Sequence, residues 1–158
     1  MELTALIMDK RSKKVKQFSL PADVEYVASE FGYDREDIAF TTQSIEELPA
    51  LNCEGLTLYL ANSIAENVED VEENLVLSFI ESESSDPSYL ANVNFDDCKL
   101  YPHIVTDREL GWYLVDEVGL ELSKETLQNY FDYEKYGRDV RLSESGSFVD
   151  KGYFVSKW

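Results

Sequence analysis

The start of the chain alternates between apolar and polar residues in a way that predicts a β-hairpin. Residues 2–8 (ELTALIM) and 14–18 (KVKQF) are the predicted strands, and the basic segment DKRSK between them suits the turn. Apolar residues then recur at helical spacing over residues 24–31, and a third strand is predicted over residues 38–42. Together these elements make a small ββαβ module over residues 1–43.

The middle of the chain has helical periodicity. Residues 44–47 have the S-x-x-E spacing of a capping box, which predicts a short helix. Two longer helices are predicted over residues 55–66 and 68–81, and the pattern leaves open whether they are continuous. The first of them is predicted from the apolar positions Leu56, Tyr59, Leu60 and Ile64. A further short helix over residues 86–93 completes a helical module that spans residues 44–94.

The last part of the chain contains both strand-like and helix-like patterns. Residues 99–105 predict a strand, and the proline within them favours the edge of a sheet. Residues 106–109 have the spacing of a second capping box, which starts a helix that Gly119 ends. The turn Asp150-Lys151-Gly152 predicts a hairpin near the C-terminus. The chain is therefore predicted to be α+β, with a C-terminal α/β module over residues 95–158.

A second helix of the C-terminal module is crowded with aromatic residues. Ser123 is a suitable N-cap and Gly137 a suitable residue just after the last turn, so the helix is predicted between them. Its apolar face and flank are formed by Leu127, Tyr130, Phe131, Tyr133 and Tyr136. An aromatic-rich core helix is the ordinary interpretation of such a segment. A contact with a partner is the alternative, because one small helix needs less aromatic surface than this.

Charge is the most informative part of the composition. The chain of 158 residues has 32 acidic and 14 basic residues, a formal net charge of −18. Residues 21–98 hold nineteen of the acids and a single base, whereas five bases cluster in residues 1–20. Such a field repels nucleic acid and anionic membranes, attracts basic surfaces and costs stability through self-repulsion. Because the excess is concentrated in one part of the chain, it indicates a binding surface rather than general solubility.

The densest acidic stretch runs from the end of the first long helix predicted in the middle of the chain into the start of the second. We call its members the central carboxylates: Glu66, Glu69, Asp70, Glu72 and Glu73. If the two helices are continuous, four of these side chains share one stripe at i, i+3, i+4 and i+7, with Glu72 beside it. Seven residues of helix rise about 10 Å, and duplex DNA carries about six phosphate charges over that length. Mimicry of DNA is therefore one interpretation, and a solvated charged face is the other.

The segment NYFDYEKYGRD in the aromatic helix resembles the C-terminal motif of the ArdA-type antirestriction proteins, and the hairpin after it is also similar. This resemblance implies a DNA mimic carried by a mobile element: an elongated chain of small modules, mostly dimeric, bound to the DNA groove of type I restriction–modification enzymes. It implies no catalysis and no cofactor. The predicted motif residues, which are also possible dimer contacts, are Leu127, Tyr130, Phe131, Asp132, Tyr133, Tyr136, Gly137, Arg138 and Asp139.

The acidic residues of the first two modules are the candidates for phosphate mimicry. They are Asp34, Glu36, Asp37, Glu46, Glu47, Glu54, Glu66, Glu69, Asp70, Glu72, Glu73, Glu81 and Glu83. Charge geometry does not select a target, so a CRISPR effector or a nucleoid protein is an alternative to a type I enzyme. An uncharacterised enzyme is the second alternative, and it requires a cleft with convergent polar groups. The basic residues of the first hairpin are expected to form a solvated turn, with a nucleic-acid contact as the alternative.

The remaining chemistry in the sequence is sparse. Cys53 and Cys98 form no metal or disulfide framework and are expected to be free thiols. Asp96, Asp97 and Cys98 lie near His103, but their spacing matches no zinc or calcium site, so a histidine on an edge strand is expected. The chain has no run of 18 apolar residues and no signal-peptide pattern. A cytoplasmic location in a bacterial host is therefore predicted.

Overall fold

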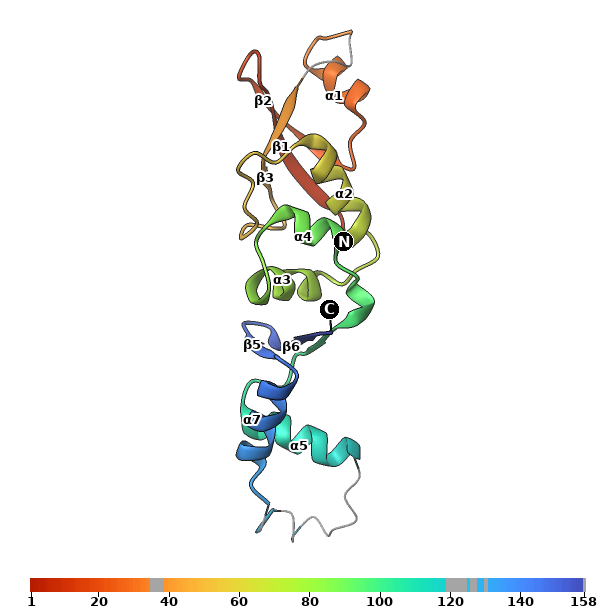
Figure 1. Ribbon diagram of the computed structural model, residues 1–158. Coiled ribbons are helices and arrows are strands. Elements are labelled where there is room, and N and C mark those ends of the chain that lie inside the picture. Colours follow the sequence, from red (N-terminus) through yellow and green to blue (C-terminus); the bar gives the residue numbers. More distant parts are fainter. Residues whose placement is uncertain (35–38, 119–124, 126–127, 130, 158) are drawn as a thin grey trace. The chain divides into compact units, whose positions relative to one another are not determined.

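The chain folds into two compact units, which are described separately. They comprise Met1–Val93 and Asn94–Trp158. The computed structural model describes residues 1–34, 39–118, 125, 128–129 and 131–157 (Figure 1). Each unit contains a three-stranded antiparallel sheet together with helices, which confirms the predicted α+β class. The division into three modules and the elongated shape stay predictions.

The sheet of the first unit has strand β1 at its centre. β1 (Leu3–Asp9) pairs antiparallel with β2 (Val15–Leu20) on one side and with β3 (Phe40–Ile45) on the other. Every second side chain of β1 is buried, so the period of two seen in the sequence marks the core face. The predicted hairpin is confirmed, and the third strand is shifted towards the C-terminus relative to its predicted bounds.

The helix predicted over residues 44–47 is wrong. Ser44 and Ile45 belong to β3, where Ile45 lies opposite Ala5 of β1 and is only 2% exposed. Burying an isoleucine side chain stabilises a fold by about 1.5–3 kcal/mol, whereas an N-cap contributes about 1 kcal/mol, so the strand is favoured. Glu47, the last residue of the predicted capping box, instead accepts a hydrogen bond from the backbone N–H of Thr4 at 2.7 Å.

A buried carboxylate organises the turn between β1 and β2. Asp9 is fully buried and accepts hydrogen bonds from the backbone N–H groups of Arg11 and Ser12 (3.0 and 3.4 Å) and from the hydroxyls of Ser12 and Tyr33 (both 2.6 Å). Burial alone would raise the pKa of Asp9, but these donors lower it from 3.8 to about 2. The turn that displays the basic residues is therefore held by an acid that stays charged.

We expect Asp9→Asn to lower the temperature of thermal unfolding at neutral pH, because an amide oxygen replaces a carboxylate that accepts four hydrogen bonds. Since the folded-state pKa of Asp9 lies below its ordinary value, the stabilisation is present above about pH 4 and is lost as the pH falls towards 2. The difference in melting temperature between the two proteins, followed by circular dichroism, should therefore shrink below about pH 4.

The matched control for this experiment is Asp23→Asn, at an exposed helix N-cap. Asparagine caps a helix about as well as aspartate, so the control should change the melting temperature little. A difference between wild type and Asp9→Asn that stayed constant down to the acid end of the range would contradict the role given to the Asp9 charge.

In the described residues of the first unit, four helices contribute to the rest of its core. They are α1 (Val24–Glu30), α2 (Leu58–Val68), α3 (Glu73–Ser82) and α4 (Pro87–Asn92). Asp23, Thr57 and Asp86 act as side-chain N-caps of α1, α2 and α4. The predicted helices over 24–31 and 86–93 are confirmed, and the predicted helix over 55–66 is confirmed two to three residues later.

Helix α2 buries one face and exposes an aromatic residue on another. Ile64 and Val68 are fully buried, and α2 lies against α4. Asn67 ties the two helices together, because its Nδ2 donates to the backbone carbonyls of Leu90 (2.9 Å) and Val93 (3.0 Å). Tyr59, one of the apolar positions that predicted this helix, is instead 82% exposed. It is therefore not part of the core.

Helices α2 and α3 are separate. α2 ends at Val68 and α3 begins at Glu73, five residues later than the predicted start of the second helix. The α-amino group of Met1 donates to the carbonyls of Val68 (2.7 Å), Glu69 (2.5 Å) and Val71 (3.2 Å), which occupies acceptors that a continuing helix would use. The predicted stripe of four central carboxylates on one continuous helix is therefore wrong.

The sheet of the second unit has the order β4-β6-β5. β4 (Cys98–Tyr101) follows a short 3₁₀ turn, η1 (Phe95–Asp97), and pairs with β6 (Gly152–Ser156). β5 (Ser147–Val149) forms a hairpin with β6, as predicted. β4 is an edge strand, also as predicted, but it ends before Pro102 instead of at residue 105, because proline lacks the N–H of a ladder.

Two helices of the second unit are described in full or nearly so, α5 (Asp107–Val118) and α7 (Tyr133–Ser143). The predicted capping box at the start of α5 is confirmed in both directions. Thr106 Oγ1 accepts from the Glu109 N–H at 3.2 Å, and Glu109 Oε2 accepts from the Thr106 N–H at 3.2 Å. The predicted end of this helix at Gly119 lies outside the described residues.

Candidate functional site

The central carboxylates gather where α2 gives way to α3. Glu66 lies in the last turn of α2, Glu69 and Asp70 lie in the connection, and Glu72 and Glu73 start α3. All five are exposed. Within the described part of the chain, none of them has an ion-pair partner. The broken helix thus replaces the predicted stripe by a bend in the chain that presents five uncompensated charges.

The other predicted phosphate mimics are spread over the first unit. Asp34, Glu46, Glu54, Glu81 and Glu83 are exposed, whereas Glu36 and Asp37 lie outside the described residues. Glu47 is half-buried and serves the sheet through its contact with Thr4, so it is less suited to a partner. The loops that carry Glu54 and Glu83 lie side by side, because the Asn52 N–H donates to the Ser85 carbonyl at 2.9 Å.

The charge of the first unit has a clear asymmetry. Residues 1–93 contain nineteen acids and six bases, a formal net charge of −13. Five of those bases lie in residues 10–16, at the turn held by Asp9. Lys16 in this group donates to the Glu30 carbonyl and lies 5.5 Å from the centre of the Phe31 ring. The acidic residues beyond the hairpin are therefore largely without compensating bases in the sequence.

In the segment with the ArdA-like motif, the helix begins and ends at different residues from those predicted. α7 begins at Tyr133, and Asp132 is its N-cap, with Oδ1 accepting from the Lys135 N–H at 2.9 Å. Gly137 lies inside this helix, so its predicted place just after a helix end is wrong. Two of the predicted motif residues lie outside the described residues, Leu127 and Tyr130.

Two glycines allow α5 and α7 to approach each other closely. A Cβ atom at Gly137 would lie 1.7 Å from the Asp107 carbonyl oxygen, and one at Gly111 would lie 2.0 Å from the Tyr133 carbonyl oxygen. Both obstacles are backbone atoms, so a side chain at either position would push the helices apart. Gly111 was not among the predicted site residues, although a glycine inside an apolar helical pattern is a signal of such a contact.

The aromatic residues of the motif form a core between the same two helices. Tyr133 is 5% exposed and stacks on Trp112 of α5, with ring centres 4.9 Å apart. The Phe131 ring contacts Tyr133 (5.1 Å) and Tyr136 (5.4 Å) edge to face. The described aromatic residues of the motif are thus used inside the unit, which favours the core interpretation. Their predicted role in a dimer stays a prediction.

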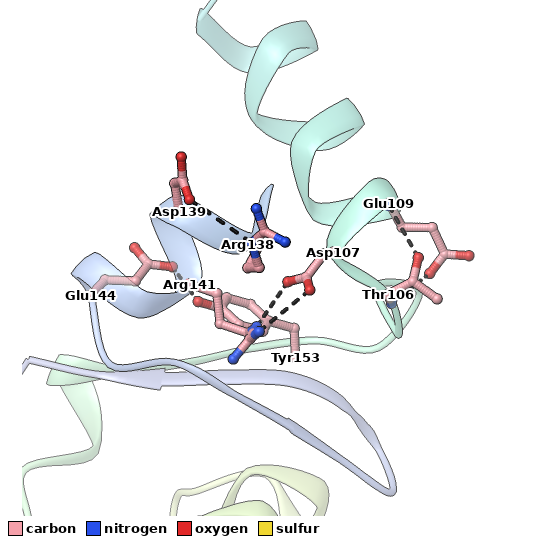
Figure 2. A network of polar contacts seen from close by, with 8 residues as sticks. All are labelled: Thr106, Asp107, Glu109, Arg138, Asp139, Arg141, Glu144 and Tyr153. Atoms are coloured by element: carbon pink, nitrogen blue, oxygen red, sulfur yellow. Dashed lines mark hydrogen bonds and ion pairs between the residues drawn. The ribbon is translucent and has the colours of Figure 1, made fainter. Parts of the chain in front are cut away.

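A polar network joins α5 and α7 to the sheet (Figure 2). Arg141 of α7 donates to both carboxylate oxygens of Asp107 of α5, at 2.8 and 3.3 Å, and this pairing raises the pKa of Arg141. Tyr153 of β6 is fully buried and donates to the Glu144 carboxylate; burial and this hydrogen bond raise the pKa of Tyr153. The network fixes the orientation of α7, from which Arg138 and Asp139 point outward as an exposed pair 4.0 Å apart.

Three further observations concern other kinds of site. Cys98 is buried and Cys53 half-buried, and both are free thiols as predicted. In the described ranges, no three His, Cys, Asp or Glu side chains are placed to hold a metal ion. Of the helices that the structure describes, none is both long and apolar enough to cross a membrane.

The comparison with protein families agrees with the resemblance seen in the motif. The family model described as antirestriction protein (ArdA) matches residues 12–155, which is nearly the whole chain and includes both units. A comparison with curated proteins gave no match. The match therefore extends far beyond the aromatic segment that first suggested it, and the chain belongs to the ArdA family of antirestriction proteins.

Proposed function

We propose that this antirestriction protein is a DNA mimic that occupies the DNA-binding groove of a type I restriction–modification enzyme and so blocks restriction and modification. The family suggests a restriction enzyme as the partner. The type I target and the mimicry are our inference. The protein acts in this proposal by binding alone, without catalysis or a cofactor.

The observation that carries the proposal is the cluster of central carboxylates. Eight consecutive positions, 66–73, hold five exposed carboxylates and no base. Duplex DNA carries one charge per ~1.7 Å, so five charges correspond to about 9 Å of duplex. Exposed, uncompensated carboxylates keep their full field, and a basic groove that binds phosphates attracts them for the same reason.

Other exposed acids would extend the contact along the first unit. We include Asp34, Glu46, Glu54, Glu81 and Glu83 in the proposed surface. The proposal also retains pairing of two copies through the C-terminal unit. Because Tyr133 and Gly137 are buried inside that unit, such pairing would use exposed motif residues such as Arg138 and Asp139.

We expect the affinity for a purified type I enzyme, measured without DNA by isothermal titration calorimetry, to weaken at least about tenfold between 50 and 200 mM salt. Proteins that make 6–10 phosphate contacts lose about 10³–10⁵ in affinity over this range, and a mimic with fewer condensed counterions should lose less. The control is the binding of the enzyme's methyl-donor cofactor under the same conditions. An affinity indifferent to salt would contradict the electrostatic proposal.

A further inference from the structure

A hollow lies between α2 and α4 of the first unit, and we propose that it receives a guanidinium group, from an arginine side chain of the target enzyme. The hollow has a volume of about 460 Å³, and its lining includes Tyr59, Ser63, Glu66 and Asn67 of α2 and Ala91 and Asn92 of α4. This inference rests on the proposed function, because it names one contact that the mimic would make.

One wall of the hollow is an aromatic ring that the fold does not use. Tyr59 is 82% exposed, and within the described residues its ring has no aromatic, cationic or hydrogen-bond partner. Glu66 lies seven residues later, two turns along the same helix face. Both residues line the same hollow, roughly 10 Å apart along α2. An exposed ring attracts a cation to its face, and a carboxylate in the same hollow pairs with the charge of that cation.

The polar groups of the hollow are left with more acceptors than donors. Both N–H bonds of the Asn67 amide are directed at backbone carbonyls, those of Leu90 and Val93. The Asn92 Nδ2 likewise donates to the Ser88 carbonyl at 2.7 Å. Their Oδ1 atoms and the Glu66 carboxylate therefore remain to accept hydrogen bonds, while the second N–H of Asn92 and the Tyr59 hydroxyl remain as donors. Because acceptors predominate and one of them is charged, the hollow favours a cationic ligand with several donors.

Among side chains, arginine meets these requirements best. Its guanidinium group has five N–H donors and no acceptor, and its flat face stacks on an aromatic ring. Lysine has only three donors on a compact, strongly hydrated ammonium. Arginine is also the side chain that contacts phosphates in pairs of hydrogen bonds. An arginine that binds a phosphate of DNA would find the Glu66 carboxylate and the Tyr59 ring in its place.

The test is the affinity of Tyr59→Leu and Tyr59→Phe for the purified type I enzyme. We expect Tyr59→Leu to weaken binding about fivefold, because the ring is lost, and Tyr59→Phe to bind within about twofold of wild type, because the ring remains. Tyr89→Leu is the matched control, since Tyr89 is an exposed tyrosine of α4 that does not line the hollow. It should bind like wild type.

A double-mutant cycle shows whether Tyr59 and Glu66 hold the same group. If they share one guanidinium, Tyr59→Leu combined with Glu66→Gln should weaken binding by clearly less than the product of the two single effects. Multiplicative effects, or wild-type affinity of Tyr59→Leu, would overturn the inference. If wild-type binding still weakens with salt in that case, the proposed mimicry stands; if it does not, the proposed function fails separately.

Two further measurements exclude other occupants. N-acetylarginine amide should shift the NMR signals of the Tyr59 ring more than N-acetyllysine amide at equal concentration, whereas equal shifts would overturn the choice of a guanidinium. Sedimentation of wild type and Tyr59→Leu should give the same oligomeric state. A change of state in the variant would mean that the hollow binds a second copy of this chain, and the inference would be wrong.

Discussion

A single methyl group at Gly137 is expected to destabilise the C-terminal unit strongly. In Gly137→Ala the new Cβ would lie 1.7 Å from the Asp107 carbonyl oxygen and 2.8 Å from the Gly111 nitrogen. Contacts of this kind need at least about 3.0 Å, and both neighbours are backbone atoms of α5 that cannot rotate away. The helices would have to separate, which would also disturb the stacking of Tyr133 on Trp112.

The size of the effect follows from two opposing contributions. Alanine is favoured over glycine inside a helix by about 1 kcal/mol, which would stabilise the variant. Forcing a group into a packed interface costs about 1–3 kcal/mol and occasionally more, and a clash with backbone belongs at the upper end. We therefore expect a net loss of roughly 2 kcal/mol or more, which is a large part of the roughly 3–10 kcal/mol available to a unit of this size.

Tryptophan fluorescence during urea unfolding is the measurement. Trp112 lies on α5 in contact with Tyr133, so its emission reports on the packing of α5 against α7. Arg138→Ala, one residue further along α7 and exposed, is the control and should unfold close to wild type. Gly111→Ala should resemble Gly137→Ala, because its Cβ would meet the Tyr133 carbonyl at 2.0 Å. Wild-type stability of both glycine variants would show that the helices do not cross at these residues.

Gly137 also shows why the sequence misled at this helix. A glycine after an apolar helical segment is the ordinary sign of a helix end, and local pattern gives no way to distinguish it from a glycine that admits a neighbouring helix. The distinction depends on Asp107 and Gly111, which are distant in sequence. The capping box at Thr106 was predictable because its donors and acceptors all lie within four residues.

In the first unit too, predictions were correct where local pattern decides the structure and wrong where a contact distant in sequence decides it. Alternation alone was sufficient for β1, whose buried side chains follow the period of two from Leu3 onward. The spacing of residues 44–47 satisfied a helix rule equally well, and only the pairing of Ile45 with Ala5 decided for a strand. The break between α2 and α3 could likewise not be predicted from local pattern, because the group that contacts the Val68 carbonyl belongs to Met1, which is distant in sequence.

The candidate site was predictable in composition but not in geometry. Counting charges identified the central carboxylates, and the structure leaves them exposed as a charged surface requires. Their arrangement around a bend depended on the helix break. The hollow was missed because Tyr59 fits an apolar helical pattern, and the pattern does not tell an exposed aromatic residue from a buried one.

Neutralising the central carboxylates is expected to weaken inhibition strongly while the fold survives. In this variant, glutamine replaces the four glutamates of the group and asparagine replaces its one aspartate, Asp70. Each exposed charge pair with a basic groove is worth about 0.2–1 kcal/mol, so five losses sum to about 1–5 kcal/mol, or roughly fivefold to several thousandfold in affinity. The measurement is inhibition of a purified type I enzyme, with circular dichroism to confirm the fold.

The effect on stability should be small because the charges at the two helix ends act in opposite directions. Glu66 and Glu69 lie at the C-terminal end of α2, where negative charge opposes the helix dipole, so their neutralisation stabilises the fold. Glu72 and Glu73 lie at the N-terminal end of α3, where negative charge is favourable. Each such interaction is worth about 0.3–1 kcal/mol, so the free energy of unfolding should change by no more than about 1 kcal/mol.

A matched control tests whether the loss of inhibition follows from total charge alone. The exposed acids of the second unit, such as Asp116, Glu117 and Glu134, can be neutralised in a separate variant with a similar change in net charge. If inhibition depended only on the total charge, both variants would lose the same affinity. We expect the loss to follow the central carboxylates, because a basic groove responds to charge within about 8–10 Å rather than to the sum over the molecule. Equal losses in the two variants would show that inhibition depends on the total negative charge and not on mimicry by the central carboxylates.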